Sequence, residues 1–205
     1  MSIAEKLTTI AENVQKVFDA GKEAERDKFW DEFQQNGNRM NYRYAFYDNY
    51  TDEMFHPKYP FKCVNNCSNM FQYCKLTKIE QTVDFSVSTQ TAISSVFANT
   101  VYLETISDLR VKSGLSIANW FTSAKALKNI TITGEIDLDA SFVDCPLSDE
   151  SIDNIISCLK ELPDGTTKTL TVSDAVYNRM VERNKVAEVI AKNWSLVSPS
   201  NPKGV

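Results

Sequence analysis

The sequence predicts an α/β protein: a short, irregular solenoid of stacked repeats preceded by an N-terminal amphipathic helix. Three observations carry this prediction. One apolar pattern occurs three times between residues 70 and 132. The N-terminal part of the chain has an apolar heptad pattern, and helix–strand units follow the repeats. A solenoid suits such a chain because each repeat can bury its apolar face only against its neighbours.

Each copy of the pattern runs from a phenylalanine through a short spacer to a leucine and an isoleucine. The copies occupy residues 71–79, 97–106 and 121–132. Their phenylalanines are 26 and 24 residues apart, and their leucines are 27 and 24 apart. We expect each Leu-x-x-Ile part to form a short buried strand, and each phenylalanine to fill the core from the opposite side of its coil. Residues 63–197 are assigned to the solenoid, which includes the units after the repeats.

The C-terminal part of the chain predicts longer helix–strand units that close the solenoid. Ser148 begins an amphipathic helix as its N-cap, and residues 168–173 alternate as a strand does. A second helix is expected over residues 174–192, followed by a strand over residues 194–197. Residues 198–205 contain two prolines and a glycine, so we expect this tail to be frayed.

The N-terminal segment, residues 1–37, is predicted to be a helix that attaches or oligomerises the protein. Its apolar side chains recur at alternating intervals of four and three residues, which is the pattern of a coiled-coil seam. They are Ile3, Leu7, Ile10, Val14 and Val17. Two interpretations remain open: the helix docks on its own domain, or it self-associates as a coiled coil.

Residues 38–62 are rich in aromatic side chains, and we interpret them as the N-terminal cap of the solenoid. A solenoid exposes apolar surface at its ends and requires such a cap. The alternative is a ligand surface, because exposed tyrosines are well suited to contacts with sugars and with protein partners. The candidate tyrosines are Tyr42, Tyr44, Tyr47 and Tyr50.

Composition excludes several classes of function. The net charge of −5 argues against nucleic acid as a partner. No apolar run approaches the roughly 18 residues that a membrane span needs. The N-terminal residues lack the uninterrupted apolar stretch of a secretory signal peptide, so we expect any role outside the cell to depend on another route of release.

The five cysteines do not form a pattern typical of metal ligands or of a disulfide scaffold. Their number is odd, and His56 is the sole histidine of the chain. Cys74 lies three residues after Phe71, where we expect a small buried side chain. We therefore predict no metal and no cofactor.

The unit Phe-x-x-Cys-x-Leu-x-x-Ile at residues 71–79 resembles the BspA-like leucine-rich repeats of bacterial surface proteins. Residues 97–106 and 121–132 match it without the cysteine, and all three copies lack the usual Ile-Pro that follows. The N-terminal helix, together with residues 30–37, also resembles short proteins encoded by phages and prophages of Gram-positive gut bacteria. These resemblances imply a leucine-rich-repeat solenoid and a virion or tail-associated role.

The predicted function is a non-enzymatic binding or structural module, specifically a phage tail-associated or receptor-binding protein. The expected location is the virion or, alternatively, the bacterial cell surface, where the protein would be an adhesin or a host-interaction protein. Expected partners are other virion or surface proteins, a bacterial surface glycan or protein, and further copies of the chain through the N-terminal helix. Besides the tyrosines, the candidate ligand surface includes polar side chains on the predicted strands: Lys78, Glu80, Glu104, Arg110 and Lys128.

A carbohydrate-active enzyme is the competing hypothesis. Glu135, Asp137 and Asp139 alternate, so on a strand their carboxylates would share one face. A suitably spaced carboxylate pair can hydrolyse glycosidic bonds. A solvated strand face explains the same pattern, and we assign no catalytic residue.

Overall fold

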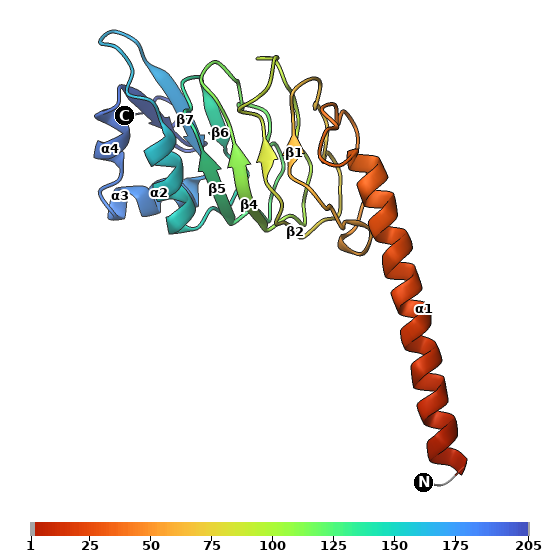
Figure 1. Cartoon of the computed structure of the whole chain (residues 1–205). Coiled ribbons are helices and arrows are strands. Elements are labelled where there is room, and N and C mark those ends of the chain that lie inside the picture. The colour runs from red at the N-terminus through yellow and green to blue at the C-terminus, as the bar shows by residue number, and fades with distance from the viewer. Residues whose placement is uncertain (1–2, 205) are drawn as a thin grey trace.

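Short parallel strands lying side by side form the body of the protein, and a long helix runs out from one end (Figure 1). The computed structural model describes the backbone of residues 3–204, and the side chains of residues 17 and 20–204. The helices are α1 (Ile3–Gln34), α2 (Asp149–Cys158), α3 (Asp174–Glu182), α4 (Val186–Ile190) and a short 3-10 turn, η1 (Asp52–Met54). The architecture is therefore α/β, as predicted.

The first sheet is built from strands that are two to six residues long. They are β1 (Phe61–Lys62), β2 (Lys78–Ile79), β3 (Val83–Asp84), β4 (Thr105–Arg110) and β5 (Asn129–Thr133). All pairings are parallel: β4 lies against β5 on one side, and against both β2 and β3 on the other. β1 pairs with β3 at the outer end of the sheet.

A register shift in the first sheet follows from the spacing of its apolar residues. In β5 the buried side chains are Ile130 and Ile132, two residues apart, as in a regular strand. In β4 they are Ile106 and Leu109, three residues apart. The pairing between the two strands therefore shifts between Ile106 and Leu109, since one additional residue of β4 must be accommodated.

The phenylalanines of the three sequence copies lie in one stack. The ring of Phe71 is 5.4 Å from that of Phe97, which is 5.5 Å from that of Phe121, and the rings of both pairs are nearly parallel. The rings stack because their backbones are hydrogen-bonded neighbours: Phe71 N donates to Val96 O, and Phe97 N donates to Trp120 O. The residue three positions after each phenylalanine is small and buried, as expected for Cys74.

Two further phenylalanines extend this stack beyond the three copies. Phe46 lies 5.0 Å from Phe71, and Phe142 lies 4.9 Å from Phe121. The backbone of Phe46 also donates to Met70 O, so the chain around Phe46 is one more layer of the same arrangement. The cap of this end comes instead from α1, where Trp30 is buried and lies 5.8 Å from the ring of Phe46.

The second sheet contains β6 (Ala140–Phe142), β7 (Lys168–Val172) and β8 (Trp194–Val197), again in parallel. The predicted strands 168–173 and 194–197 thus match β7 and β8. The predicted helix over residues 174–192 is instead divided into α3 and α4. The break lies at Asn184, whose φ of 57° is left-handed and cannot continue a helix.

Gln34, in the last turn of α1, pairs with the backbone that leads into β1. Its Oε1 accepts hydrogen bonds from Lys58 N (2.7 Å) and Tyr59 N (2.9 Å), and its Nε2 donates to Tyr59 O (2.7 Å). The side chain is completely buried. One buried amide therefore satisfies three backbone groups in the segment before β1 and fixes the end of α1 to that segment.

The helix α2 protects the edge of the first sheet that is formed by β5. α2, capped by the hydroxyl of Ser148 as predicted, lies beside β5. Asn154 accepts from Ile132 N (2.7 Å) and donates to Ile132 O (3.0 Å), and the Ser151 hydroxyl accepts from Ile130 N (2.8 Å). The edge strand is thus satisfied by helix side chains instead of a sixth strand.

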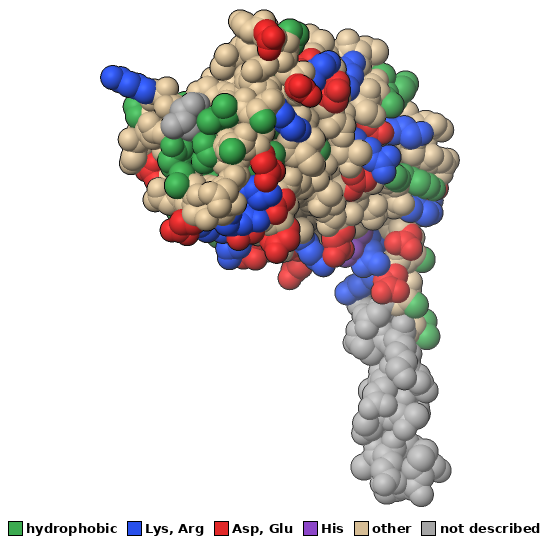
Figure 2. Space-filling model, turned by 90° about the vertical axis from the view of Figure 1, so that its left-hand side faces the viewer, with side chains coloured by type: hydrophobic (Ala, Val, Ile, Leu, Met, Phe, Trp, Pro, Cys, Tyr) green, Lys and Arg blue, Asp and Glu red, His purple; other side chains and the backbone are tan. Residues whose placement is uncertain are grey.

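Ion pairs join α2 to the chain around α3 at the C-terminal end of the body. Arg183 lies 2.6 Å from Asp153 and Arg179 lies 3.3 Å from Asp149, while Lys185 adds a contact of 3.3 Å to Asp153. Basic and acidic side chains are interspersed over the lower part of this end in Figure 2. Because the pairs form a network, they contribute more than isolated surface pairs would.

The C-terminal tail is tied to the body as far as Gly204, which corrects the prediction of a frayed segment. Ser200 donates from its backbone N and its hydroxyl to the carboxylate of Asp174, at 2.8 and 2.9 Å. The Asn201 amide donates to the Tyr177 hydroxyl at 2.6 Å. Composition did not reveal these partners, because both lie on α3, more than 20 residues earlier in the chain.

We expect Gln34→Ala to lower the free energy of unfolding by about 1–3 kcal/mol, because the backbone groups of Lys58 and Tyr59 lose their partner. Urea denaturation of the full chain measures the change. Glu32→Ala is the matched control on the same helix, where the carboxylate is exposed and should contribute less than about 0.5 kcal/mol. Equal effects of the two substitutions would contradict the role of Gln34.

Candidate functional site

Three tyrosines form a connected, solvent-exposed row on the body. The rings of Tyr44 and Tyr47 are 5.3 Å apart, and those of Tyr47 and Tyr73 are 5.6 Å apart, each pair meeting edge to face. Their side chains are 48%, 43% and 46% exposed. The guanidinium of Arg43 lies 5.0 Å from the centre of the Tyr44 ring. We call Arg43, Tyr44, Tyr47 and Tyr73 the tyrosine surface.

The phenylalanine stack positions these tyrosines. Tyr47 directly follows Phe46, and Tyr73 lies two residues after Phe71. The two segments are held side by side where Asp48 N donates to Gln72 O at 2.9 Å. Since both phenylalanines are buried in the stack, the tyrosines beside them are presented outward on adjacent segments.

Two of these tyrosines occupy backbone positions that do not favour them. The residue two positions after each of the first four stacked phenylalanines has a left-handed φ, between 55° and 62°, at Asp48, Tyr73, Asn99 and Ser123. Asn, Asp and other small polar residues tolerate this conformation, whereas a bulky side chain is strained there by about 1 kcal/mol. Tyr44, with φ of 55°, is the second case.

A cationic, amide-lined hollow adjoins the tyrosine surface. It has a volume of about 610 Å³ and shares Arg43 with that surface; its lining is Gln35, Asn38, Arg39, Met40, Asn41, Arg43 and Asn65. Arg39 is held in place, because its Nε donates to Asn41 O at 3.0 Å and its Nη1 donates to Phe33 O at 3.3 Å. Among the described residues, the guanidinium of Arg43 has no carboxylate partner.

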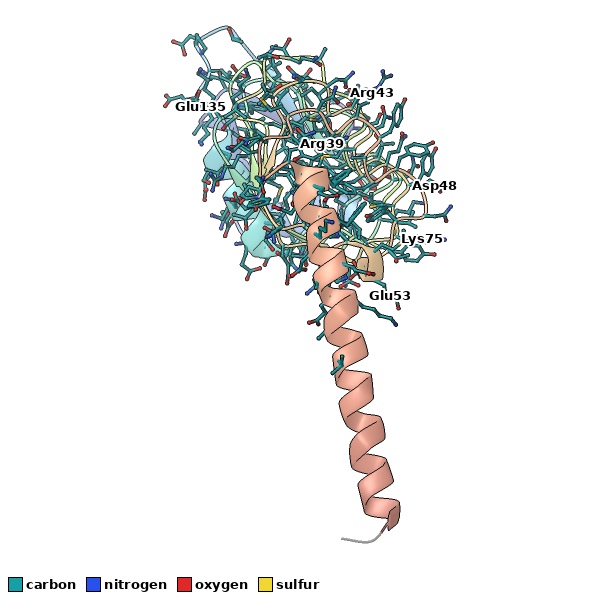
Figure 3. All side chains as sticks on the ribbon, turned by 45° about the vertical axis from the view of Figure 1, so that its right-hand side comes forward. Arg39, Arg43, Asp48, Glu53, Lys75 and Glu135 are labelled. Carbon is teal, nitrogen blue, oxygen red and sulfur yellow. The ribbon has the colours of Figure 1, made fainter. Side chains whose placement is uncertain are left out.

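The charges around this site are mostly positive, although the whole chain carries −5. Residues 35–48 and 65–75 include three basic side chains, Arg39, Arg43 and Lys75, and one acidic side chain, Asp48. In Figure 3, Arg43, Asp48 and Lys75 are labelled one after another along the same side of the body. Within these two segments, basic side chains therefore outnumber acidic ones.

The sequence predicted part of this surface and missed part of it. Tyr44 and Tyr47 are exposed, as a ligand surface requires, but Tyr42 is completely buried, which corrects its inclusion. Burial raises the pKa of its hydroxyl to about 12. Tyr50 is partly buried against the core, and its ring lies 5.2 Å from that of Phe46. Tyr73 was missed, although aligning the three copies at their phenylalanines would have put it beside the polar Asn99 and Ser123.

The predicted strand residues lie away from the tyrosines, on the first sheet and its flanking turns. Lys78, Glu80, Glu104, Arg110 and Lys128 are all exposed. Lys78 pairs with Glu80 at 2.8 Å, and Arg110 pairs with Asp108 at 3.0 Å. Lys78 and Glu80 also line a hollow of about 380 Å³ beside His56 and Asp27. Their exposure agrees with the prediction, while their binding role stays a prediction.

The carboxylates of the enzyme hypothesis have separate partners. Asp137 accepts from the Ser113 hydroxyl and from Gly114 N, and Asp139 accepts from Thr169 N at 2.8 Å. Glu135 pairs with Lys160 at 3.3 Å. Partial burial by itself would raise the pKa of Asp137, but its hydrogen bonds and Lys160 together lower it. A glycosidase acid needs the opposite shift.

The helical seam lies largely outside the described side chains. Those of Ile3, Leu7, Ile10 and Val14 are not among them, while Val17 is 74% exposed. Within the described part of the chain, no helix combines the length and the apolarity that a membrane crossing requires. The same residues contain no cluster of three His, Cys, Asp or Glu side chains arranged to hold a metal ion.

Comparisons of the chain with protein-family models, with curated proteins and with solved structures found no match. The candidate site is therefore assigned from its geometry alone.

We expect Tyr73→Asn to raise the free energy of unfolding by about 0.5–1 kcal/mol, because asparagine relieves the left-handed strain. Urea denaturation measures the difference. Tyr102→Asn is the control: Tyr102 is 56% exposed and does not have a positive φ. A loss of stability in Tyr73→Asn relative to this control would show that the ring of Tyr73 stabilises the fold.

Proposed function

We propose that this chain is a non-enzymatic binding module that recognises a bacterial surface component through the tyrosine surface. One observation carries the proposal: Tyr44 and Tyr73 are aromatic residues at strained backbone positions, yet their rings remain largely exposed. Strain without burial does not favour folding, so it points to a role in binding. Tyrosine offers a large contact area with little loss of conformational entropy, which suits recognition.

The body of this module is proposed to be a short, irregular leucine-rich-repeat solenoid. The parallel pairing of β1, β3, β4 and β5 supports this, as does the stack of phenylalanines at intervals of 24 to 26 residues. In such a body, each layer is stabilised mainly by its neighbours. The result is a stiff support for an exposed surface.

The proposed role of α1 is attachment through association with further copies of the chain. The helix contains 32 residues, which corresponds to a length of about 48 Å at 1.5 Å per residue. Its C-terminal turns are anchored by Trp30 and Gln34, and the rest projects beyond the body in Figure 1. A projecting helix with a heptad pattern gains stability by pairing with equivalent helices.

The virion is the proposed location, with the bacterial surface as the alternative. This part of the proposal rests on the resemblance to phage-encoded repeat proteins, and it stays a prediction. Either location would give the module access to a surface glycan or protein of a bacterium.

Binding of the fluorescently labelled full-length protein to a panel of intact Gram-positive cells tests the proposed function. We expect the combined variant Tyr44→Ala, Tyr47→Ala, Tyr73→Ala to lose at least about tenfold in affinity, because three aromatic contacts are removed. The matched control is Glu104→Ala with Lys128→Ala, on the first-sheet side. Loss of binding in the control variant alone would assign recognition to those residues and contradict the proposal.

Sedimentation velocity of the full-length protein tests association through α1. We expect the wild type to sediment as an oligomer and the variant Ile10→Asp, Val17→Asp as a monomer. In this variant, association would bury two aspartate carboxylates of each helix in the apolar seam of the coiled coil. Glu23→Gln is the control on the same helix. Point variants are preferable to deletion of residues 1–37, since deletion would remove the buried Trp30 and Gln34. A monomeric wild type would contradict the coiled coil.

A further inference from the structure

We propose that the ligand of the tyrosine surface is a phosphodiester-linked glycan, in which sugar rings lie on the tyrosines and a phosphate binds at Arg43. This inference rests on the proposed function and narrows its ligand to one chemical class. It joins two features that meet at a single residue, because Arg43 lies beside the ring of Tyr44 and also lines the adjoining hollow.

The tyrosine row suits the sugar part of such a ligand. Tyr47 contacts both Tyr44 and Tyr73, so the three rings support one another and lose little freedom when a ligand binds. An aromatic ring has an apolar body that can cover the C–H face of a sugar, and a hydroxyl that can bond to the hydroxyls of that sugar. The row extends over two adjacent segments, so it suits an extended chain better than a single small sugar.

Arg43 and the hollow suit an anionic group. The hollow is lined by two arginines and no acidic residue, and Arg39 is already engaged by carbonyl groups. Arg43 is the exposed cation that a ligand would meet, and a guanidinium donates two parallel hydrogen bonds to an oxyanion. Charge complementarity therefore favours an anionic polymer over a neutral one.

The neutral donors of the hollow favour phosphate over carboxylate. Gln35, Asn38 and Asn65 line the hollow, and each has a side-chain amide that can donate a hydrogen bond. The oxygens of a phosphodiester are arranged tetrahedrally and can accept hydrogen bonds from several directions, whereas those of a carboxylate lie in one plane. Donors that are spread around a hollow suit the tetrahedral group.

Purified cell walls from a strain that the protein binds provide the probe. Cold hydrofluoric acid cleaves phosphodiester bonds and leaves glycosidic and peptide bonds intact. We expect full-length protein to lose at least about tenfold in affinity for the treated walls, and to bind protease-treated walls as before. Binding should also weaken between low salt and about 0.5 M salt, since an exposed ion pair is screened.

Arg43→Gln should lose about tenfold in affinity for untreated walls, because a charge-assisted hydrogen bond is removed. Lys203→Gln, which removes an exposed positive charge from the C-terminal tail, is the control and should bind as the wild type does. The phosphodiester proposal would be overturned if the wild type bound acid-treated walls undiminished, or if Arg43→Gln bound untreated walls as the wild type does. Either result would leave the proposed function intact. Loss after protease would indicate a protein receptor and also overturn it. If the triple tyrosine variant binds walls as well as wild type, both proposals fail.

Discussion

The stack of five phenylalanine rings, from Phe46 to Phe142, is the interaction on which the other parts of the structure depend. Successive rings lie 4.9 to 5.5 Å apart. That separation is close to the distance between neighbouring strands, so the rings can stack only while the backbones that carry them remain hydrogen-bonded in register. The stack therefore sets which side chains can reach the surface.

A short stack of layers has two open ends, and a helix packs at each of them, with a side-chain amide that bonds to the backbone of the body. Gln34 of α1 pairs with the backbone at one end, and Asn154 of α2 pairs with Ile132 at the other. Each amide presents one donor and one acceptor, which are the groups that a neighbouring strand would supply. At β5 this arrangement covers an edge that could otherwise pair with another chain.

The tyrosine surface is a local departure from an otherwise consistent pattern. At the left-handed positions after the phenylalanines, Asp48, Asn99 and Ser123 are residues that the conformation tolerates, and Tyr73 is not. Local sequence and global fold agree over most of a protein, and conflicts between them are concentrated at functional sites. Tyr73, where this conflict occurs, lies beside Tyr47. The guanidinium of Arg43 belongs to the same surface and lies beside Tyr44.

The sequence by itself determined the α/β class, the period of the layers, the capped start of α2 and the strands β7 and β8. These follow from local spacing, because apolar periodicity and N-cap chemistry act over a few residues. Only the tertiary structure decided that Tyr42 is buried while Tyr44 is exposed, that Phe46 belongs to the stack, and that Ser200 is bound to Asp174. Each of these depends on a partner that is at least 19 residues away in the chain, such as Phe61 for Tyr42. Periodicity carries no information about such a partner until the layers are brought into register.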